Sequence, residues 1–100
     1  MALTLAELTE RMHRFVASKG FYADDTPRRQ VPRNLAISLV LEASEVLEHF
    51  QWGEEAPAAE LADELADVAL YLLQLASVSG IDLEQAILDK LARNQRREWH

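Results

Sequence analysis

The stretch LEASEVLEHFQW, residues 41–52, carries three glutamates at intervals of three residues along a segment that is otherwise largely apolar. A second stretch, ELADELADVALYLL at residues 60–73, spaces its acidic residues in a similar way. Side chains three or four residues apart lie on the same face of an α-helix. The two stretches therefore predict a pair of helices with carboxylates beside their apolar sides, and this pair decides the fold.

Each of the two helices shows an apolar stripe when about 100° of rotation is assigned to each residue. The stripe of the first consists of Leu35, Leu39, Ala43, Val46 and Phe50. The stripe of the second consists of Leu61, Leu65, Val68, Leu72 and Leu75. The carboxylates flank these stripes, so two helices packed through them would place both acidic rows at one cleft.

Start and stop signals predict four helices and no strands, which makes the fold class all-α. TLAE at residues 4–7 is a capping box, Pro57 suits a first helical turn, and Asp82 is followed three residues later by Gln85. The loop GFYADDTPRRQVP contains one glycine and two prolines. The expected helices run from Thr4 to about Lys19, from Pro32–Asn34 to Gly53, from Pro57 to about Ser79, and from Asp82 to about Asn94. Short connections between the last three favour antiparallel neighbours in a small bundle.

Composition narrows the class of protein. A chain of 100 residues is expected to form one domain, residues 1–100. The net charge of −7 argues against nucleic-acid binding. The absence of cysteine fits a cytoplasmic protein, and neither a signal peptide nor a membrane-spanning segment is indicated.

Apolar residues outside the two stripes, such as Leu41, Leu70 and Leu73, point to further burial between chains. A chain of this size has a small core and often oligomerises to bury more surface. The sequence therefore predicts a homodimer or a homotetramer.

The acidic rows favour a metal site. Two carboxylates about 4 Å apart repel each other by roughly 4 kcal/mol at an effective dielectric constant of 20. A divalent cation removes that repulsion, and a set of oxygen ligands suits Mg²⁺, with Mn²⁺ as a second choice. A di-iron site would need Glu-x-x-His twice, and the position of His49 does not provide it. Acidic pairs are also common on solvated helix faces, so a structural role remains open.

Taken together, NLAISLVLEASEVLEHFQW, ELADELADVALYLLQLA and KLARN resemble the MazG-like, all-α nucleotide pyrophosphatase superfamily, and most closely its dCTP pyrophosphatase branch. The resemblance covers about residues 32–95. It rests on the ordered combination of Glu-x-x-Glu, a further glutamate, Glu-x-x-Asp and Lys-x-x-x-Asn, because no single piece is specific.

This resemblance implies Mg²⁺-dependent hydrolysis of a nucleoside triphosphate between its α and β phosphates, with house-cleaning as the expected role. It assigns Glu42, Glu45, Glu64 and Asp67 as metal ligands. It also implies that one of these glutamates, with Glu48, activates the attacking water, and the predicted catalytic residues are Glu45 and Glu48. Such chemistry requires charge neutralisation and positioning more than a protein nucleophile.

The resemblance also implies substrate contacts by Trp52, Tyr71, Lys90 and Asn94. Trp52 would stack on the base, and Lys90 and Asn94 would contact the phosphates. Three of the four have a structural alternative: an aromatic at the core edge for Trp52, a hydrogen-bond donor to carboxylates for Tyr71, and a helix cap for Asn94.

Two segments depart from the family pattern and leave the base unassigned. DDTPRRQVPRNL has Gln30 where the dCTP-specific members carry a histidine, with Phe21 and Tyr22 as the nearest aromatic residues. EWH, residues 98–100, replaces the usual Tyr-Pro. A non-catalytic helical interaction module with solvated acidic faces is the alternative function.

Overall fold

The computed structural model describes residues 2–97 of the protein. It contains four helices: α1 (Leu5–Ser18), α2 (Pro32–Glu48), α3 (Ala58–Val78) and α4 (Leu83–Gln95). No strand occurs among the described residues. The prediction of an all-α fold with four main helices is therefore confirmed.

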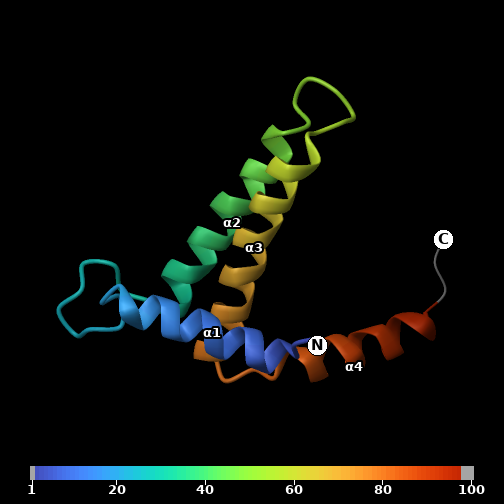
Figure 1. Ribbon diagram of the computed structural model, residues 1–100. Coiled ribbons are helices and arrows are strands. Elements are labelled where there is room, and N and C mark those ends of the chain that lie inside the picture. The colour runs from blue at the N-terminus through green and yellow to red at the C-terminus, as the bar shows by residue number, and fades with distance from the viewer. Residues whose placement is uncertain (1, 98–100) are drawn as a thin grey trace.

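The central unit is an antiparallel hairpin of α2 and α3, which lie side by side along most of their length (Figure 1). α1 packs against α3 and crosses the hairpin at the end opposite the connection between α2 and α3 (Figure 1). α4 leads away from the hairpin, at a bend of 101° to α3, and makes no contact with α2. The prediction of antiparallel neighbours therefore holds for α2 and α3 but is wrong for α3 and α4. The acidic helix pair predicted from the sequence is thus the centre of the fold.

Local chemistry sets the helix starts. The Thr4 hydroxyl accepts from the backbone N–H of Glu7 at 3.1 Å, and the Glu7 carboxylate accepts from the backbone N–H of Thr4 at 3.3 Å. At α4 the Asp82 carboxylate accepts from the backbone N–H of Gln85 at 3.0 Å. These bonds satisfy donors that have no partner within the helix, and they confirm both predicted caps.

The predicted end of the second helix at Gly53 is wrong. α2 ends at Glu48, and residues 49–53 form tight turns in which Phe50 N donates to the Leu47 carbonyl at 2.9 Å and Gly53 N to the Phe50 carbonyl at 3.3 Å. Hydrogen bonds between residues three apart replace the four-residue pattern here, as is common at helix ends. Trp52 consequently lies on a turn and not on a helix.

The core of a single chain is small. The buried apolar residues are Met12, Val16, Leu35, Leu73 and Ala76. Leu73 was predicted to lie off the packed side of its helix and is instead 7% exposed, because α1 packs on the C-terminal half of α3. Leu65 and Leu72, predicted as part of the apolar stripe, are 50% and 40% exposed.

Many large apolar side chains remain exposed on the hairpin and on α4. None of the residues of α4 is buried, and Ile87, Leu88 and Leu91 are each more than 40% exposed. Val40, Leu41 and Leu70 are also exposed on the hairpin. Across residues 2–97, no single helix is long and apolar enough to cross a membrane, and only α3 and α4 together, bent by 101°, reach that length and composition.

Candidate functional site

Three carboxylates from the two central helices meet at one point. Glu42 of α2 and Glu64 and Asp67 of α3 each offer one oxygen, and these oxygens all lie within 4.8 Å of one another. Glu42 and Glu64 are half-buried, whereas Asp67 is exposed. We call these three residues the acidic cluster. Its geometry follows from the spacing of the acids on two helices packed antiparallel.

Glu45 lies beside the acidic cluster. Burial is the main cause that raises the pKa of Glu42 above its ordinary value, and repulsion from the Glu45 carboxylate adds to it. Burial also raises the pKa of Glu64, with a further contribution from a hydrogen bond with Glu45. His49 acts in the opposite direction on Glu64, and its Nε2 lies 3.8 Å from a Glu64 oxygen. The fold therefore holds several acids together at a cost in charge repulsion.

Two oxygens of the acidic cluster are buried without any hydrogen-bond partner: Oε2 of Glu42 and Oε2 of Glu64. A buried polar atom with no partner is costly and calls for an explanation. A hard divalent cation with oxygen ligands would supply one. The donor set, the raised pKa values and the unpartnered oxygens all fit such a cation.

A cavity of about 590 Å³ adjoins the acidic cluster. Asp67 belongs to both, and Tyr71 and Gln74 continue the lining along the same face of α3. The opposite wall comes from α1 and from the connection between α1 and α2, with Phe15, Phe21, Arg28 and Arg29. The cavity thus joins a metal-binding edge to a partly aromatic, partly basic interior.

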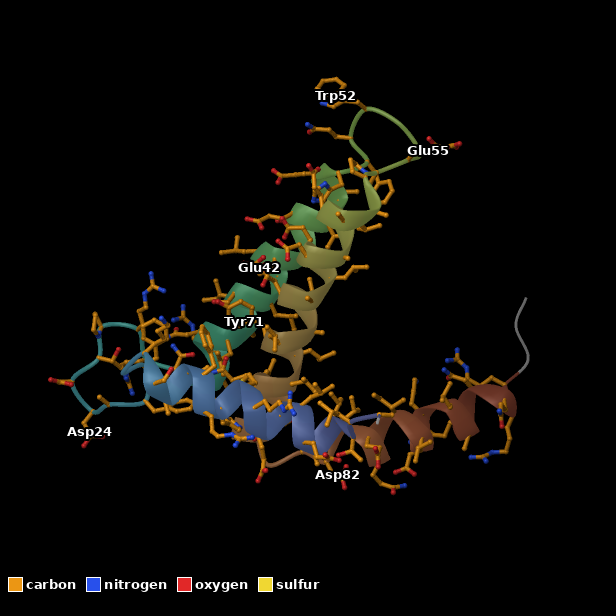
Figure 2. All side chains as sticks on the ribbon, viewed as in Figure 1. Asp24, Glu42, Trp52, Glu55, Tyr71 and Asp82 are labelled. Atoms are coloured by element: carbon orange, nitrogen blue, oxygen red, sulfur yellow. The ribbon has the colours of Figure 1, made fainter. Side chains whose placement is uncertain are left out.

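The structure does not bring all of the predicted substrate-binding residues to the cavity beside the acidic cluster. Tyr71 lines the cavity, one turn beyond Asp67, as its spacing predicts. Trp52 is 92% exposed at the tip of the hairpin (Figure 2). Lys90 and Asn94 belong to α4, which has no contact with α2, so a single chain does not bring them to the acidic cluster.

Two further predictions concern other parts of the chain. Glu48, predicted to be catalytic, is exposed one turn beyond Glu45 on α2. The EWH segment, residues 98–100, lies outside the described residues.

Other lining residues were missed by the sequence reasoning. Gln74 is 3% exposed, and its Nε2 donates to Gln30 Oε1 at 2.8 Å and to the Tyr22 hydroxyl at 3.2 Å. From the sequence, Gln30 is only a departure from the family pattern, and Phe21 and Tyr22 are only the aromatic residues nearest to it. The available signal was a lone glutamine in the apolar run LYLLQLA, seven residues after Asp67 and hence on the same helical face.

The fold is all-α, and its two central helices bring together three carboxylates that could hold a metal ion. The model of the MazG-like family matches residues 37–99, which is more than half of the chain. The chain therefore belongs to the MazG-like family.

The relatives that the chain matches are named as nucleotide-hydrolysing enzymes. The chain is 43% identical over 76 residues to human dCTP pyrophosphatase 1, covering 66% of this chain and 45% of that protein, and 42% identical over the same length to the Bos taurus protein. It thus spans about half the length of these relatives. It is also 50% identical over 38 residues to the dATP/dGTP diphosphohydrolase of Salmonella phage PMBT28, covering 38% of this chain and 13% of that protein.

A solved structure shares the whole arrangement. The crystal structure of a pyrophosphatase from Archaeoglobus fulgidus superposes with a TM-score of 0.80 at 30% identity, covering 96% of this chain and 93% of that one. The match therefore includes α1 and α4 as well as the hairpin.

Proposed function

We propose that this protein is a Mg²⁺-dependent nucleoside triphosphate pyrophosphohydrolase, which releases a nucleoside monophosphate and pyrophosphate from common or modified nucleotides. The observation that carries the proposal is the place of Asp67, which belongs both to the acidic cluster and to the wall of the 590 Å³ cavity. A metal edge beside a cavity of this size suits a phosphate chain attached to a planar base. The names of the relatives support the same reaction class.

The acidic cluster would hold the cation, with Glu45 as a fourth ligand and Mn²⁺ as a possible substitute for Mg²⁺. When bound, a divalent cation would neutralise the charge on the phosphate oxygens and favour the attack of water on the phosphorus. The water oxygen bonds to the α-phosphorus while the bridge to the β-phosphate breaks, and pyrophosphate leaves.

The proton of the attacking water needs an acceptor. Glu45 interacts with the carboxylates of Glu42 and Glu64 yet is itself exposed, so it can accept that proton and pass it to solvent. Glu48, one turn further along α2, is the neighbouring candidate. The chain has no cysteine, so a thiolate nucleophile does not enter the reaction.

Basic side chains at the cavity counter the charge of the substrate. Arg11, Arg28 and Arg29 line it, and the guanidinium of Arg28 lies 5.3 Å above the ring of Phe21. In a protein with a net charge of −7, such a local group of cations attracts a polyanion to this side of the molecule.

The site is completed, in this proposal, by a second copy of the chain in a homodimer or homotetramer. On α4, Leu83, Ile87 and Leu91 share one helical face with Lys90 and Asn94 when about 100° is assigned to each residue. That face carries exposed apolar side chains and has no partner on α2. In the proposed assembly, a second copy would pack on this face of α4, and Lys90 and Asn94 of one copy would lie near the acidic cluster of the other.

Pyrophosphate release from a panel of NTPs and dNTPs tests the function, with ³¹P NMR to identify the bond that is cleaved. Activity should require Mg²⁺ and should fall at least about 100-fold in Asp67→Asn, because a charged cation ligand is lost. Asp63→Asn is the matched control, since Asp63 is exposed on the same helix and outside the cluster. Inactivity with every nucleotide, together with no effect of Mg²⁺ on stability, would favour the interaction module.

A further inference from the structure

Gln74 is the polar side chain that the described core buries most fully, at 3% exposed. It lies two turns beyond Asp67 on the same face of α3, roughly 10 Å further along the helix axis. Both residues line the same cavity. A buried amide is tolerated only when its polar atoms find partners, so the bonds of Gln74 define what it offers to a ligand.

A backbone carbonyl fixes the direction of this amide. The Arg28 carbonyl can only accept, and the Gln30 amide donates to it through Nε2 at 2.6 Å. Gln30 therefore turns its Oε1 toward Gln74, which must answer with Nε2 at 2.8 Å. Reversing either amide would set two acceptor oxygens against each other.

The second hydrogen of Gln74 Nε2 is also used. It goes to the Tyr22 hydroxyl at 3.2 Å, and Tyr22 bonds in turn with Nδ1 of His13. His13 Nε2 lies 2.7 Å from the Ser77 hydroxyl. Burial raises the pKa of Tyr22, more than the hydrogen bond from Gln74 lowers it, so the phenol stays protonated.

Only one polar atom of Gln74 is left. No described residue donates to its Oε1, and this atom is not among the buried side-chain atoms that lack a partner. Oε1 therefore retains access to open space at the cavity. Gln74 thus offers a ligand a hydrogen-bond acceptor and no donor.

We infer that Gln74 is a specificity-determining residue, which accepts a hydrogen bond from the exocyclic amino group of a nucleobase in this cavity. The inference rests on the proposed function, because that function places a nucleotide between Asp67 and Gln74. Cytosine and adenine carry such an amino group, whereas uracil and hypoxanthine present a carbonyl oxygen at the same place. Two acceptors then face each other, and a buried acceptor loses its partner.

The discrimination should be measurable as a ratio of kcat/KM values. We expect dCTP to be preferred over dUTP, and dATP over its hypoxanthine analogue, by about 10- to 100-fold, the scale of a lost buried hydrogen bond. In Gln74→Met, which keeps the length of the side chain, both ratios should fall close to about 1, since neither base then gains a bond. A ratio is independent of the fraction of enzyme that folds.

Gln30→Met tests the same mechanism at a distance from the base. Without Gln30, the amide of Gln74 is free to rotate and to offer Nε2, so the preference should also fall. This variant decides the question if Gln74→Met does not fold, because Gln30 is only half-buried and lies in a loop. Gln85→Met, on exposed α4, is the matched control and should keep the ratio of the unmodified protein.

Calorimetric binding of dCMP and dUMP in the presence of Mg²⁺ separates this inference from the proposed function. Hydrolysis of dCTP and dUTP at equal rates would overturn the role of Gln74 and leave the function standing. Tighter binding of dCMP that is lost in Gln74→Met, without any hydrolysis, would support the role of Gln74 and overturn the function. A preference that survives in Gln74→Met also overturns the role, and neither hydrolysis nor selective binding overturns both.

Discussion

Glu42 and Glu64 come from different helices, yet each places a carboxylate oxygen within 4.8 Å of the other and each has a buried Oε2 without a hydrogen-bond partner. Both pKa values are raised, mainly by burial. Burial and like charge make this pair of carboxylates costly, and the packing of α2 on α3 holds the two together. Because packing holds the two carboxylates together while their charges repel, stability should depend on both magnesium and pH.

Magnesium should stabilise the unmodified protein against heat. A cation present at ten times its Kd adds about 1.4 kcal/mol to the free energy of unfolding if it binds only the folded state. Glu42→Gln should melt at the same temperature or higher with chelator, because a repulsion has been removed, and should gain less from magnesium. Thermal melts with magnesium and with chelator measure both effects. Asp63→Asn, outside the cluster, should behave as the unmodified protein does; a loss of stability for Glu42→Gln with chelator would indicate a structural role.

The pH dependence of stability should follow the same two carboxyls. Their folded-state pKa values lie above the ordinary value of 4.5, so between that value and the raised ones the folded state binds more protons than the unfolded state. The free energy of unfolding therefore falls as pH rises through this window. With chelator, the double variant Glu42→Gln/Glu64→Gln should exceed the unmodified protein in Tm by an amount that grows with pH from about 4.5. A difference that shrinks with pH would contradict the sign.

Self-association should depend on one face of α4. Light scattering at micromolar concentration should give at least twice the chain mass of 11.3 kDa. Leu91→Asp, on the apolar face, should shift the protein toward monomer, because a charge would be buried in the contact. Ala92→Asp introduces the same side chain on the opposite face and is the control. A monomer before any substitution would remove the proposed contribution of Lys90 and Asn94 from a second copy.

Trp52 offers a separate test of assembly. Its side chain is 92% exposed at the tip of the hairpin, so Trp52→Ala should change stability by less than about 0.5 kcal/mol. If Trp52 stacks on a base held by a second copy, the variant should weaken nucleotide binding by about 1–3 kcal/mol. That effect should appear only at protein concentrations where the chain is associated. Titrations above and below the association midpoint distinguish this role from that of a surface aromatic.

Local signals made most of the fold predictable. The Thr4 and Asp82 caps, together with Gly20, Gly80 and Pro57, mark helix ends through bonds within a few residues. The acidic cluster follows from spacing along two helices. The sequence could not show that α1 packs on the C-terminal half of α3, which buries Leu73. It also could not place Gln30, because the bond to Gln74 joins residues 44 positions apart. The rotation of α3, which leaves Leu65 exposed, is likewise set by tertiary contacts.

The two glutamates on α2 that were predicted to be catalytic differ in their surroundings, and we therefore expect them to differ in their effect on catalysis. Glu45 interacts with Glu42 and Glu64, whereas no described residue contacts the Glu48 carboxylate by a hydrogen bond or an ion pair. A general base must lie within hydrogen-bond reach of the water it deprotonates. Glu45→Gln should therefore lower kcat by about 10²- to 10⁴-fold, the usual contribution of such a base, while Glu48→Gln should have a much smaller effect. Because Glu45 is also a predicted metal ligand, the magnesium-induced shift in Tm must be measured for both variants.

If Glu45→Gln loses kcat but keeps the shift in Tm, Glu45 acts in proton transfer. If Glu45→Gln loses both, Glu45 acts as a ligand of the cation. A larger loss of kcat in Glu48→Gln would instead place the water at the end of α2.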